Sequence, residues 1–166
     1  MKFLIFGGNG FLGNYLYDFI KKKFHVKIVT RQKKNGIYLK YYNLKNLKKI
    51  ISKETPDVII NTIALTNVDK CEVKKKLAYD ANVKITKLIS NAIISLKYKK
   101  PFFIHISSDQ VYSGLGPHNE KKPKPINYYS KTKLLSEKFV NLKNGCVLRT
   151  NFLGYSRNHS NLNGWI

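Results

Sequence analysis

The sequence predicts an α/β fold, a Rossmann-like, doubly wound parallel sheet with helices on both faces. Apolar strand-like runs alternate with amphipathic helical stretches along the chain, which is the pattern of such a sheet. The first apolar run leads directly into a glycine-rich turn and a helix start. A length of 166 residues with 43% apolar content is sufficient for one domain with a substantial core.

The predicted elements follow from local patterns taken in order along the chain. The strands are short apolar runs, of which the third follows Pro56 and the fourth follows Pro101: 2–6, 25–30, 57–61, 102–107 and 146–149. The helices have helical spacing of apolar residues, weakest in the second: 11–22, about 45–53, about 73–97 and about 127–142. Glycines and prolines between 113 and 125 predict a loop before the last helix.

The glycine-rich turn has the spacing GxxGxxG, with Gly7, Gly10 and Gly13. Gly7 allows a tight exit from the strand, Gly10 lets the backbone approach a phosphate, and Gly13 lets the helix pack closely on the sheet. Backbone N–H groups and the positive helix end then face a pyrophosphate. The turn predicts a dinucleotide site, and a glycine turn without ligand is the alternative.

Composition narrows the class of protein. The formal net charge of +22 comes almost entirely from lysines scattered over predicted helix surfaces, with only three arginines, so a lysine-biased composition is favoured over a specific nucleic-acid interface. No apolar run approaches a membrane span or a signal-peptide core, and we expect a cytoplasmic protein. Cys71 and Cys146 have no metal-ligand spacing and are expected to be reduced thiols, without a metal site.

Tyr129 and Lys133 stand four residues apart, on one face of the predicted last helix. A nearby ammonium stabilises a phenolate and lowers the tyrosine pKa from its usual value of about 10, which makes tyrosine usable in acid–base chemistry. In so lysine-rich a chain the pair also arises by chance. Ser107 and Ser108 end the fourth predicted strand, where open parallel sheets bind their ligands.

These motifs occur in one order that resembles the extended short-chain dehydrogenase/reductase family, and within it most closely the dTDP-4-dehydrorhamnose reductases and related nucleotide-sugar reductases. The matching segments are the glycine turn, Asp57–Asn61 with Ala64, Val68–Glu72, the Ser-Ser-Asp strand end, and Tyr129–Glu137. The resemblance implies that Ser108 bonds the substrate carbonyl, that Tyr129 donates the proton, and that Lys133 binds the nicotinamide ribose and lowers the pKa of Tyr129.

The resemblance also implies a set of binding residues. The cofactor-binding set comprises Gly7, Gly10, Phe11, Leu12, Gly13, Arg31, Ala64, Tyr129 and Lys133. The substrate-binding set comprises Thr66, Val68 and Asn82. Arg31 follows the second strand in a stretch without acidic residues, and a guanidinium there suits a 2′-phosphate, so NADPH is the favoured cofactor and NADH the alternative. The alternative is that Arg31 is a surface cation without a ligand.

Two departures keep alternatives open. Gln110 stands where the related dehydratases have a carboxylate base, which counts against a dehydratase and leaves an epimerase open. Family members have a C-terminal substrate-binding portion, so we expect residues 1–150 to be the NAD(P)-binding domain and 151–166 the start of that portion. A non-catalytic NADP-binding regulatory subunit is a further alternative. The expected partner is a nucleotide sugar, with a homodimer left open, and neither a specific nucleic acid nor a membrane is expected.

Overall fold

A computed structural model describes residues 1–33 and 36–151 of the chain. Its centre is a six-stranded sheet in which every pair of neighbouring strands is parallel. In chain order the strands are β1 (Lys2–Phe6), β2 (His25–Thr30), β3 (Ile37–Tyr38), β4 (Val58–Asn61), β5 (Phe102–Ile106) and β6 (Gly145–Leu148). They lie in the order β3-β2-β1-β4-β5-β6, which is the Rossmann order with its switch point between β1 and β4. The predicted fold class is confirmed.

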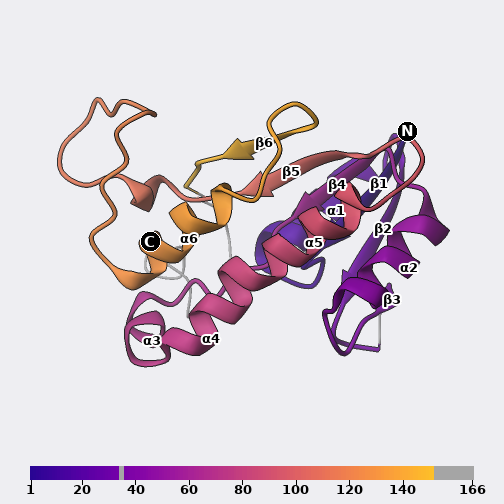
Figure 1. Cartoon of the computed structure of the whole chain (residues 1–166), viewed down its shortest axis with the longest axis horizontal. Coiled ribbons are helices and arrows are strands. Elements are labelled where there is room, and N and C mark those ends of the chain that lie inside the picture. The colour runs from indigo at the N-terminus through magenta and orange to yellow at the C-terminus, as the bar shows by residue number, and fades with distance from the viewer. Residues whose placement is uncertain (34–35, 152–166) are drawn as a thin grey trace.

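The helices pack on both faces of this sheet (Figure 1). They are α1 (Phe11–Ile20), α2 (Leu44–Glu54), α3 (Val68–Val73), α4 (Lys75–Tyr79), α5 (Ile85–Ile94) and α6 (Tyr128–Glu137). A π-helical turn, Asp80–Lys84, joins α4 to α5, and a 3-10 turn, Asp109–Val111, follows β5. The sheet therefore presents the carboxyl ends of its strands along one edge, where the loops to the helices begin.

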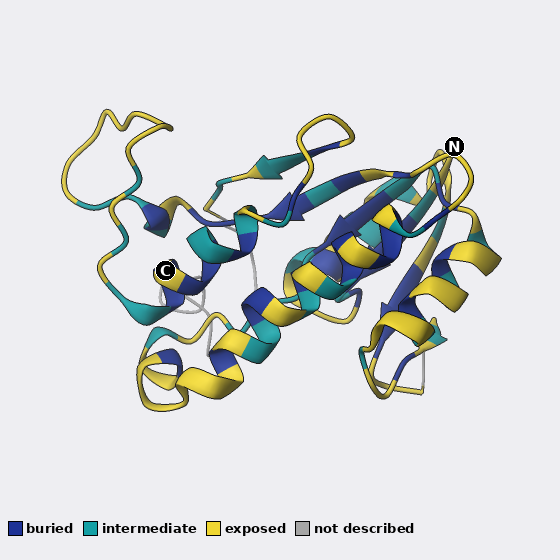
Figure 2. Ribbon diagram, viewed as in Figure 1, coloured by how far each residue is buried: buried dark blue, intermediate teal, exposed yellow. Residues whose placement is uncertain are grey.

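The two faces of the sheet carry unequal cores. On one face, Leu4, Phe6 and Ile59 pack with buried residues of α2 and α5; on the other, Ile5 and Ile60 pack with the inner residues of α1. Right-handed crossovers toward β6 place their helices on the first face. The connections from β1 to β2 and from β2 to β3 run the opposite way, and of these the first carries the helix α1. Figure 2 shows the central strands buried and the helices exposed on their outer sides.

That asymmetry leaves a large apolar hollow on the α1 face, of about 1390 Å³. Its floor is formed by the ends of β4, β5 and β6, and Leu12 and Leu16 of α1 form part of its wall. Among the residues expected to form the site, Leu12 is the only one that lines it. The hollow is therefore an uncovered part of the sheet. Glu137 and Arg149, which lie beside the site described below, also line it.

The structure differs from the predicted elements at three places. β3 was not predicted, because a two-residue strand beside Val29 and Thr30 carries too little pattern. The predicted helix over 73–97 is divided, since Lys74 leaves the helical region (φ −111°, ψ 59°), and α3 begins earlier, at the Asn67 cap. α6 starts in a capping box formed by Asn127 and Ser130 and ends at Glu137, five residues before the expected end.

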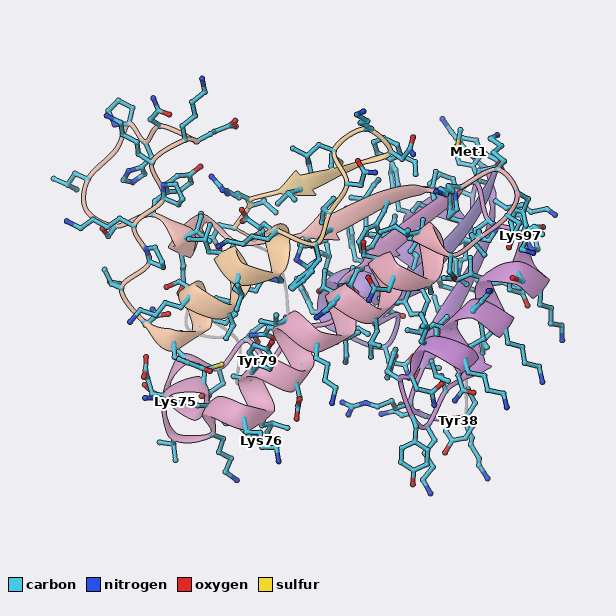
Figure 3. The ribbon with its side chains drawn as sticks, viewed as in Figure 1. Met1, Tyr38, Lys75, Lys76, Tyr79 and Lys97 are labelled. Carbon is cyan, nitrogen blue, oxygen red and sulfur yellow. The ribbon has the colours of Figure 1, made fainter. Side chains whose placement is uncertain are left out.

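The excess positive charge lies on the surface. Every lysine that the structure describes is exposed, with the single exception of Lys133. Lys75 and Lys76 of α4 project from the outside of the molecule (Figure 3). Within the described residues no helix has the length and apolar character needed to cross a bilayer. These lysines are solvated side chains, as the scattered pattern predicts.

Candidate active site

The glycine turn after β1 is built by close backbone contacts. Gly7 has a positive φ of 86°, and its carbonyl accepts a hydrogen bond from the N–H of Gly10 at 2.9 Å. A Cβ on Gly13 would lie 2.3 Å from the carbonyl oxygen of Gly7, and a Cβ on Gly8 would lie 2.3 Å from the Cβ of Ile28. Gly13 is thus required for the packing of α1 on the turn. Gly8 is required for the packing of the turn on β2.

Gly10 is different, since a Cβ there would meet a single atom. A Cβ there would meet only the Gly7 carbonyl oxygen within 4 Å, at 3.2 Å. Gly10 is also the N-cap of α1, where no side chain caps the helix and the first turn carries no acidic residue. The N–H groups of Phe11, Leu12 and Gly13 belong to the first turn, where a helix leaves its amides without intrahelical acceptors. This is a cradle that fits the diphosphate of a dinucleotide.

The loop after β4 lies against this turn, at the switch point of the sheet. Thr62 donates its hydroxyl to the carbonyl oxygens of Phe6 (2.9 Å) and Gly7 (3.2 Å). A Cβ on Gly7 would be 2.7 Å from that hydroxyl. Half-buried Ala64 follows two residues after Thr62, so the predicted cofactor residues Gly7 and Ala64 belong to neighbouring segments.

Arg31 stands at the end of β2, beside the same turn. The hydroxyl of buried Thr30 accepts a hydrogen bond from the Asn9 amide at 2.7 Å and one from the Gln32 N–H at 3.0 Å. Asn9 also donates to the Gln32 side chain at 2.9 Å. Asn9 therefore ties the glycine turn to the segment that carries Arg31. The Arg31 side chain is exposed and forms no ion pair within the described part of the chain.

Ser108, Tyr129 and Lys133 come together where α6 meets the end of β5. All three are buried, with exposed fractions of 5%, 7% and 2%. The Ser108 hydroxyl lies close enough to the Tyr129 phenol to influence its pKa. The Lys133 ammonium donates to the backbone carbonyl of Ile106 at 2.6 Å, and this is its only hydrogen bond to the described residues. An ammonium has three N–H donors, so two remain for another ligand.

The pKa values of this group differ from the simple expectation. Burial raises the pKa of the Tyr129 phenol. The Ser108 hydroxyl opposes this rise, and the nearby Cys71 and Asp109 add to it. The Lys133 ammonium is not among the causes, so the expected lowering of the Tyr129 pKa is absent from the structure. Burial also lowers the pKa of Lys133 to about 8. At neutral pH Tyr129 consequently holds its proton, which suits a proton donor.

The three residues expected to line the substrate pocket have different positions. Thr66 is exposed on the loop after β4, and half-buried Val68 packs in one apolar cluster with Tyr129. Asn82 is fully buried on the π-helical turn, where it bonds the N–H of Leu65 at 2.7 Å and the Thr132 hydroxyl at 2.9 Å. Asn82 therefore connects the loop after β4 to α6, and its side chain has no atom at the surface.

Several residues that position the site were not singled out in the sequence. Asn9 and Thr62 hold the glycine turn, and Glu137 forms an ion pair with Arg149 at 2.6 Å. The helical spacing of Glu137 from Lys133 is a signal that could have pointed to it. The two cysteines are unpaired, and the described residues contain no group of three or more metal-ligating side chains.

His105 of β5 is a further buried group behind the site. Its ring accepts from the Asn61 amide at 3.3 Å through Nδ1, which leaves Nε2 as the donor to the Ser136 hydroxyl at 2.8 Å. Ser136 in turn donates to the backbone carbonyl of Lys133 at 2.6 Å. Burial, with a smaller contribution from the Lys133 ammonium, holds the pKa of His105 well below 6.5. The ring is neutral in the folded protein.

We predict that His105 makes the protein less stable in acid. The unfolded chain takes up a proton near pH 6.5 and the folded chain does not, so the free energy of unfolding falls as pH decreases below that value, by up to about 1.4 kcal/mol per pH unit. Urea unfolding between pH 7 and pH 4.5 measures this. The variant His105→Gln should be less stable at pH 7 and lose stability less steeply in acid. An equal slope in both proteins would contradict the prediction.

Strand order, glycine turn and the Ser-Tyr-Lys group define the class of protein. It is a Rossmann-like α/β domain of the extended short-chain dehydrogenase/reductase type. A family model described as the RmlD substrate binding domain matches residues 1–165. The chain therefore belongs to the RmlD family, whose members include nucleotide-sugar enzymes similar to dTDP-4-dehydrorhamnose reductase.

Two curated relatives indicate the range of the family. The spore coat polysaccharide biosynthesis protein SpsK of Bacillus subtilis is 30% identical over 168 residues, covering 96% of this chain and 56% of SpsK. The methionine adenosyltransferase 2 subunit beta of Xenopus tropicalis is 31% identical over 153 residues, covering 88% of this chain and 45% of that protein. The chain thus spans about half the length of these relatives.

Solved structures agree with the assignment. A dTDP-4-dehydrorhamnose reductase from Clostridium acetobutylicum matches with a TM-score of 0.80 and 32% identity, over 95% of this chain and 56% of that one. The Bacillus anthracis dTDP-4-dehydrorhamnose reductase in complex with NADP matches with a TM-score of 0.79 and 26% identity, over the same shares. The fold of the described residues is the fold of these reductases.

Proposed function

We propose that this chain binds NADPH and is the cofactor-binding part of a reductase that acts on the 4-keto group of a deoxy-sugar nucleotide. The observation that carries the proposal is the burial of Lys133. In a chain whose other described lysines are all exposed, this one ammonium is enclosed where α6 meets the end of β5, one helical turn from Tyr129. Burial of a lysine lowers stability, and such groups concentrate at functional sites.

The residues present fit a nicotinamide dinucleotide. The diphosphate would rest on the amides of Phe11 and Leu12 over Gly10, and Arg31 would pair with a 2′-phosphate. The two free N–H donors of Lys133 would bind the hydroxyls of the nicotinamide ribose. When bound, the reduced nicotinamide supplies a hydride to the keto carbon.

Ser108, just after β5, and Tyr129 of α6 would bind the keto oxygen and protonate it. Ser108 would donate its hydroxyl to the carbonyl oxygen, and the Tyr129 O–H would give its proton to that oxygen as negative charge develops on it. The phenolate left behind would lie one helical turn from the enclosed ammonium of Lys133. The product is an alcohol at the former keto carbon, and a proton from water restores Tyr129.

Turnover is tested by oxidation of NADPH with dTDP-4-keto-6-deoxysugar. Removing the proton donor in Tyr129→Phe should lower kcat by about 10²–10⁴-fold, with NADPH affinity nearly unchanged. The neighbouring Tyr128 is half-buried, and Tyr128→Phe serves as the matched control, with activity close to that of the parent. Equal rates in the parent and Tyr129→Phe would refute the mechanism.

The preference for NADPH is expected to depend on Arg31. Arg31→Ala should weaken NADPH binding roughly tenfold and leave NADH binding unaltered, because only NADPH carries the 2′-phosphate. Fluorescence titration with both coenzymes measures this. Lys53→Ala, which removes an exposed cation in the last turn of α2, controls for the general attraction of an anion to this basic protein. Equal losses for NADPH in both variants would show that Arg31 is a surface cation only.

A non-catalytic, NADP-binding subunit is the second candidate. The similarity to the beta subunit of methionine adenosyltransferase 2 favours it, because that protein is named as a subunit. NADPH binding that depends on Gly10, with no coenzyme oxidation on any nucleotide-keto sugar, would support this function. Turnover that requires Tyr129 would support the reductase.

A further inference from the structure

One face of α6 contacts three consecutive residues at the end of β5. Tyr129 lies near Ser108, and Lys133 donates a hydrogen bond to the carbonyl of Ile106. One helical turn further, Glu137 accepts a hydrogen bond from the hydroxyl of Ser107 at 2.5 Å. Spacing by four places these three α6 side chains on one face of the helix. Glu137 therefore belongs to the same docking face as the two proposed active-site residues.

Glu137 is held by a two-pronged ion pair. Arg149, just after β6, donates from Nε to both carboxylate oxygens at 3.0 and 3.2 Å and from its terminal nitrogen to one of them at 2.6 Å. The two side chains are only 10% and 19% exposed, so water screens them weakly. Arg149 consequently holds the Glu137 carboxylate in a fixed orientation, unlike the ion pairs on the protein surface.

Arg149 extends the connection to the loop before α6. It donates to the hydroxyl of Tyr112 at 2.7 Å and to the backbone carbonyl of Glu120 at 2.7 Å, and its guanidinium lies 5.2 Å from the centre of the Tyr112 ring. The Tyr112 ring also stacks on His118 at 5.0 Å. The end of β6, α6 and the loop are thus joined through a single guanidinium.

The charged and titratable groups around Lys133 are few. On α6 the carboxylate is Glu137, which raises the pKa of Lys133 against the effect of burial. On β5 the neighbour is His105, which burial keeps neutral. Cys71 of α3 and Asp109 of the 3-10 turn act on Tyr129. Glu137 is the carboxylate available to balance the Lys133 ammonium.

We propose that Glu137 and Arg149 are a positioning pair: Glu137 keeps Lys133 positively charged and fixes Ser107 so that Ser108 meets Tyr129, while Arg149 fixes Glu137 and links it to the loop over residues 112–120. The inference rests on the proposed function, since the charge on Lys133 is what a ribose and a phenolate would use. It concerns the protein without coenzyme and can therefore be tested separately.

The test is the titration of the Lys133 side-chain nitrogen, followed by ¹⁵N NMR without coenzyme and assigned by its loss in Lys133→Met. In Glu137→Gln the titration midpoint should move to lower pH by about one unit, because the balancing charge is gone. In Glu137→Asp, which keeps a carboxylate, the shift should be smaller. In Arg149→Met the midpoint should rise, because the positive charge that offsets the Glu137 carboxylate is gone.

The control is Glu54→Gln, which removes a carboxylate that pairs with Lys27 on another part of the protein. It should leave the Lys133 midpoint unchanged. Circular dichroism establishes that each variant is folded. If Glu137→Gln does not fold, the Lys133 midpoints of Glu137→Asp and Arg149→Met test the inference. A Lys133 midpoint that is the same in the folded Glu137 variants as in the parent would overturn the inference. NADPH binding is measured independently, so its failure would affect only the proposed function.

Discussion

Gly10→Ala is expected to abolish detectable NADPH binding while leaving the fold intact, and Gly13→Ala to destabilise the fold by several kcal/mol. At Gly10 a methyl group meets only the Gly7 carbonyl, at 3.2 Å, and otherwise fills the space where a phosphate would lie. At Gly13 it would lie 2.3 Å from the Gly7 carbonyl oxygen and 2.9 Å from the Gly8 Cα, against backbone that cannot turn aside.

The two variants control each other because each adds one methyl group to the same turn. Urea unfolding measures the stability of both, and calorimetric titration with NADPH measures binding by the folded ones. Alanine also favours a helix over glycine by about 1 kcal/mol, so a loss in Gly13→Ala understates the steric effect. A Gly10→Ala protein that binds NADPH as tightly as the parent would show that the turn has only a structural role.

Lys133→Met is expected to stabilise the protein by about 2 kcal/mol at pH 7 and to remove most of its affinity for NADPH. The change in the Lys133 pKa from 10.5 to about 8 corresponds to about 3 kcal/mol of lost stability for the charged form. The carbonyl of Ile106 loses its hydrogen bond in the variant, which costs about 1 kcal/mol. The ammonium is therefore retained at the expense of stability.

The pH dependence of the stability difference between the parent and Lys133→Met shows whether the buried charge, and not better packing of the Met side chain, is the cause. Below pH 8 Lys133 is charged in both the folded and the unfolded chain, and the burial cost is fully present. Between pH 8 and pH 10.5 the unfolded chain binds more protons, so the parent gains stability as pH rises and the advantage of Lys133→Met shrinks. Urea unfolding at pH 7 and pH 10 measures both proteins. A variant less stable than the parent at pH 7, or an advantage independent of pH, would contradict the prediction.

The strands and the glycine turn could be predicted because their signals are local. Apolar runs bounded by turn residues located five of the six strands, and Gly7 and Gly13 have the contacts that their spacing implies. β3 was not predicted because its two residues form a strand only by pairing with Val29 and Thr30, which is a tertiary contact. The break at Lys74 likewise reflects the packing of α3 and α4 on α6, since the local sequence remains typical of a helix.

The sequence indicates which residues form the candidate site, but it does not predict how deeply they are buried or which residues they contact. Ser108, Tyr129 and Lys133 all lie where α6 packs on the end of β5, and their roles stay predictions. The raised pKa of Tyr129 depends on how deeply the phenol is enclosed. The position of Asn82 depends on the π-helical turn, which directs its amide to Leu65 and Thr132. Gly8 looked unremarkable in the sequence, yet it allows the contact with Ile28. Residues 152–166, where a substrate-binding portion was expected to begin, lie outside the described residues.

Calorimetric titration of the folded chain with NADPH is the most direct test of the central claim, that the amides after β1 and the ammonium of Lys133 hold a nicotinamide dinucleotide. We expect binding of one NADPH per chain, weaker binding of NADH, and loss of the NADPH signal in Gly10→Ala. Folded protein that gives no binding signal with either coenzyme, by heat or by fluorescence, would contradict the account.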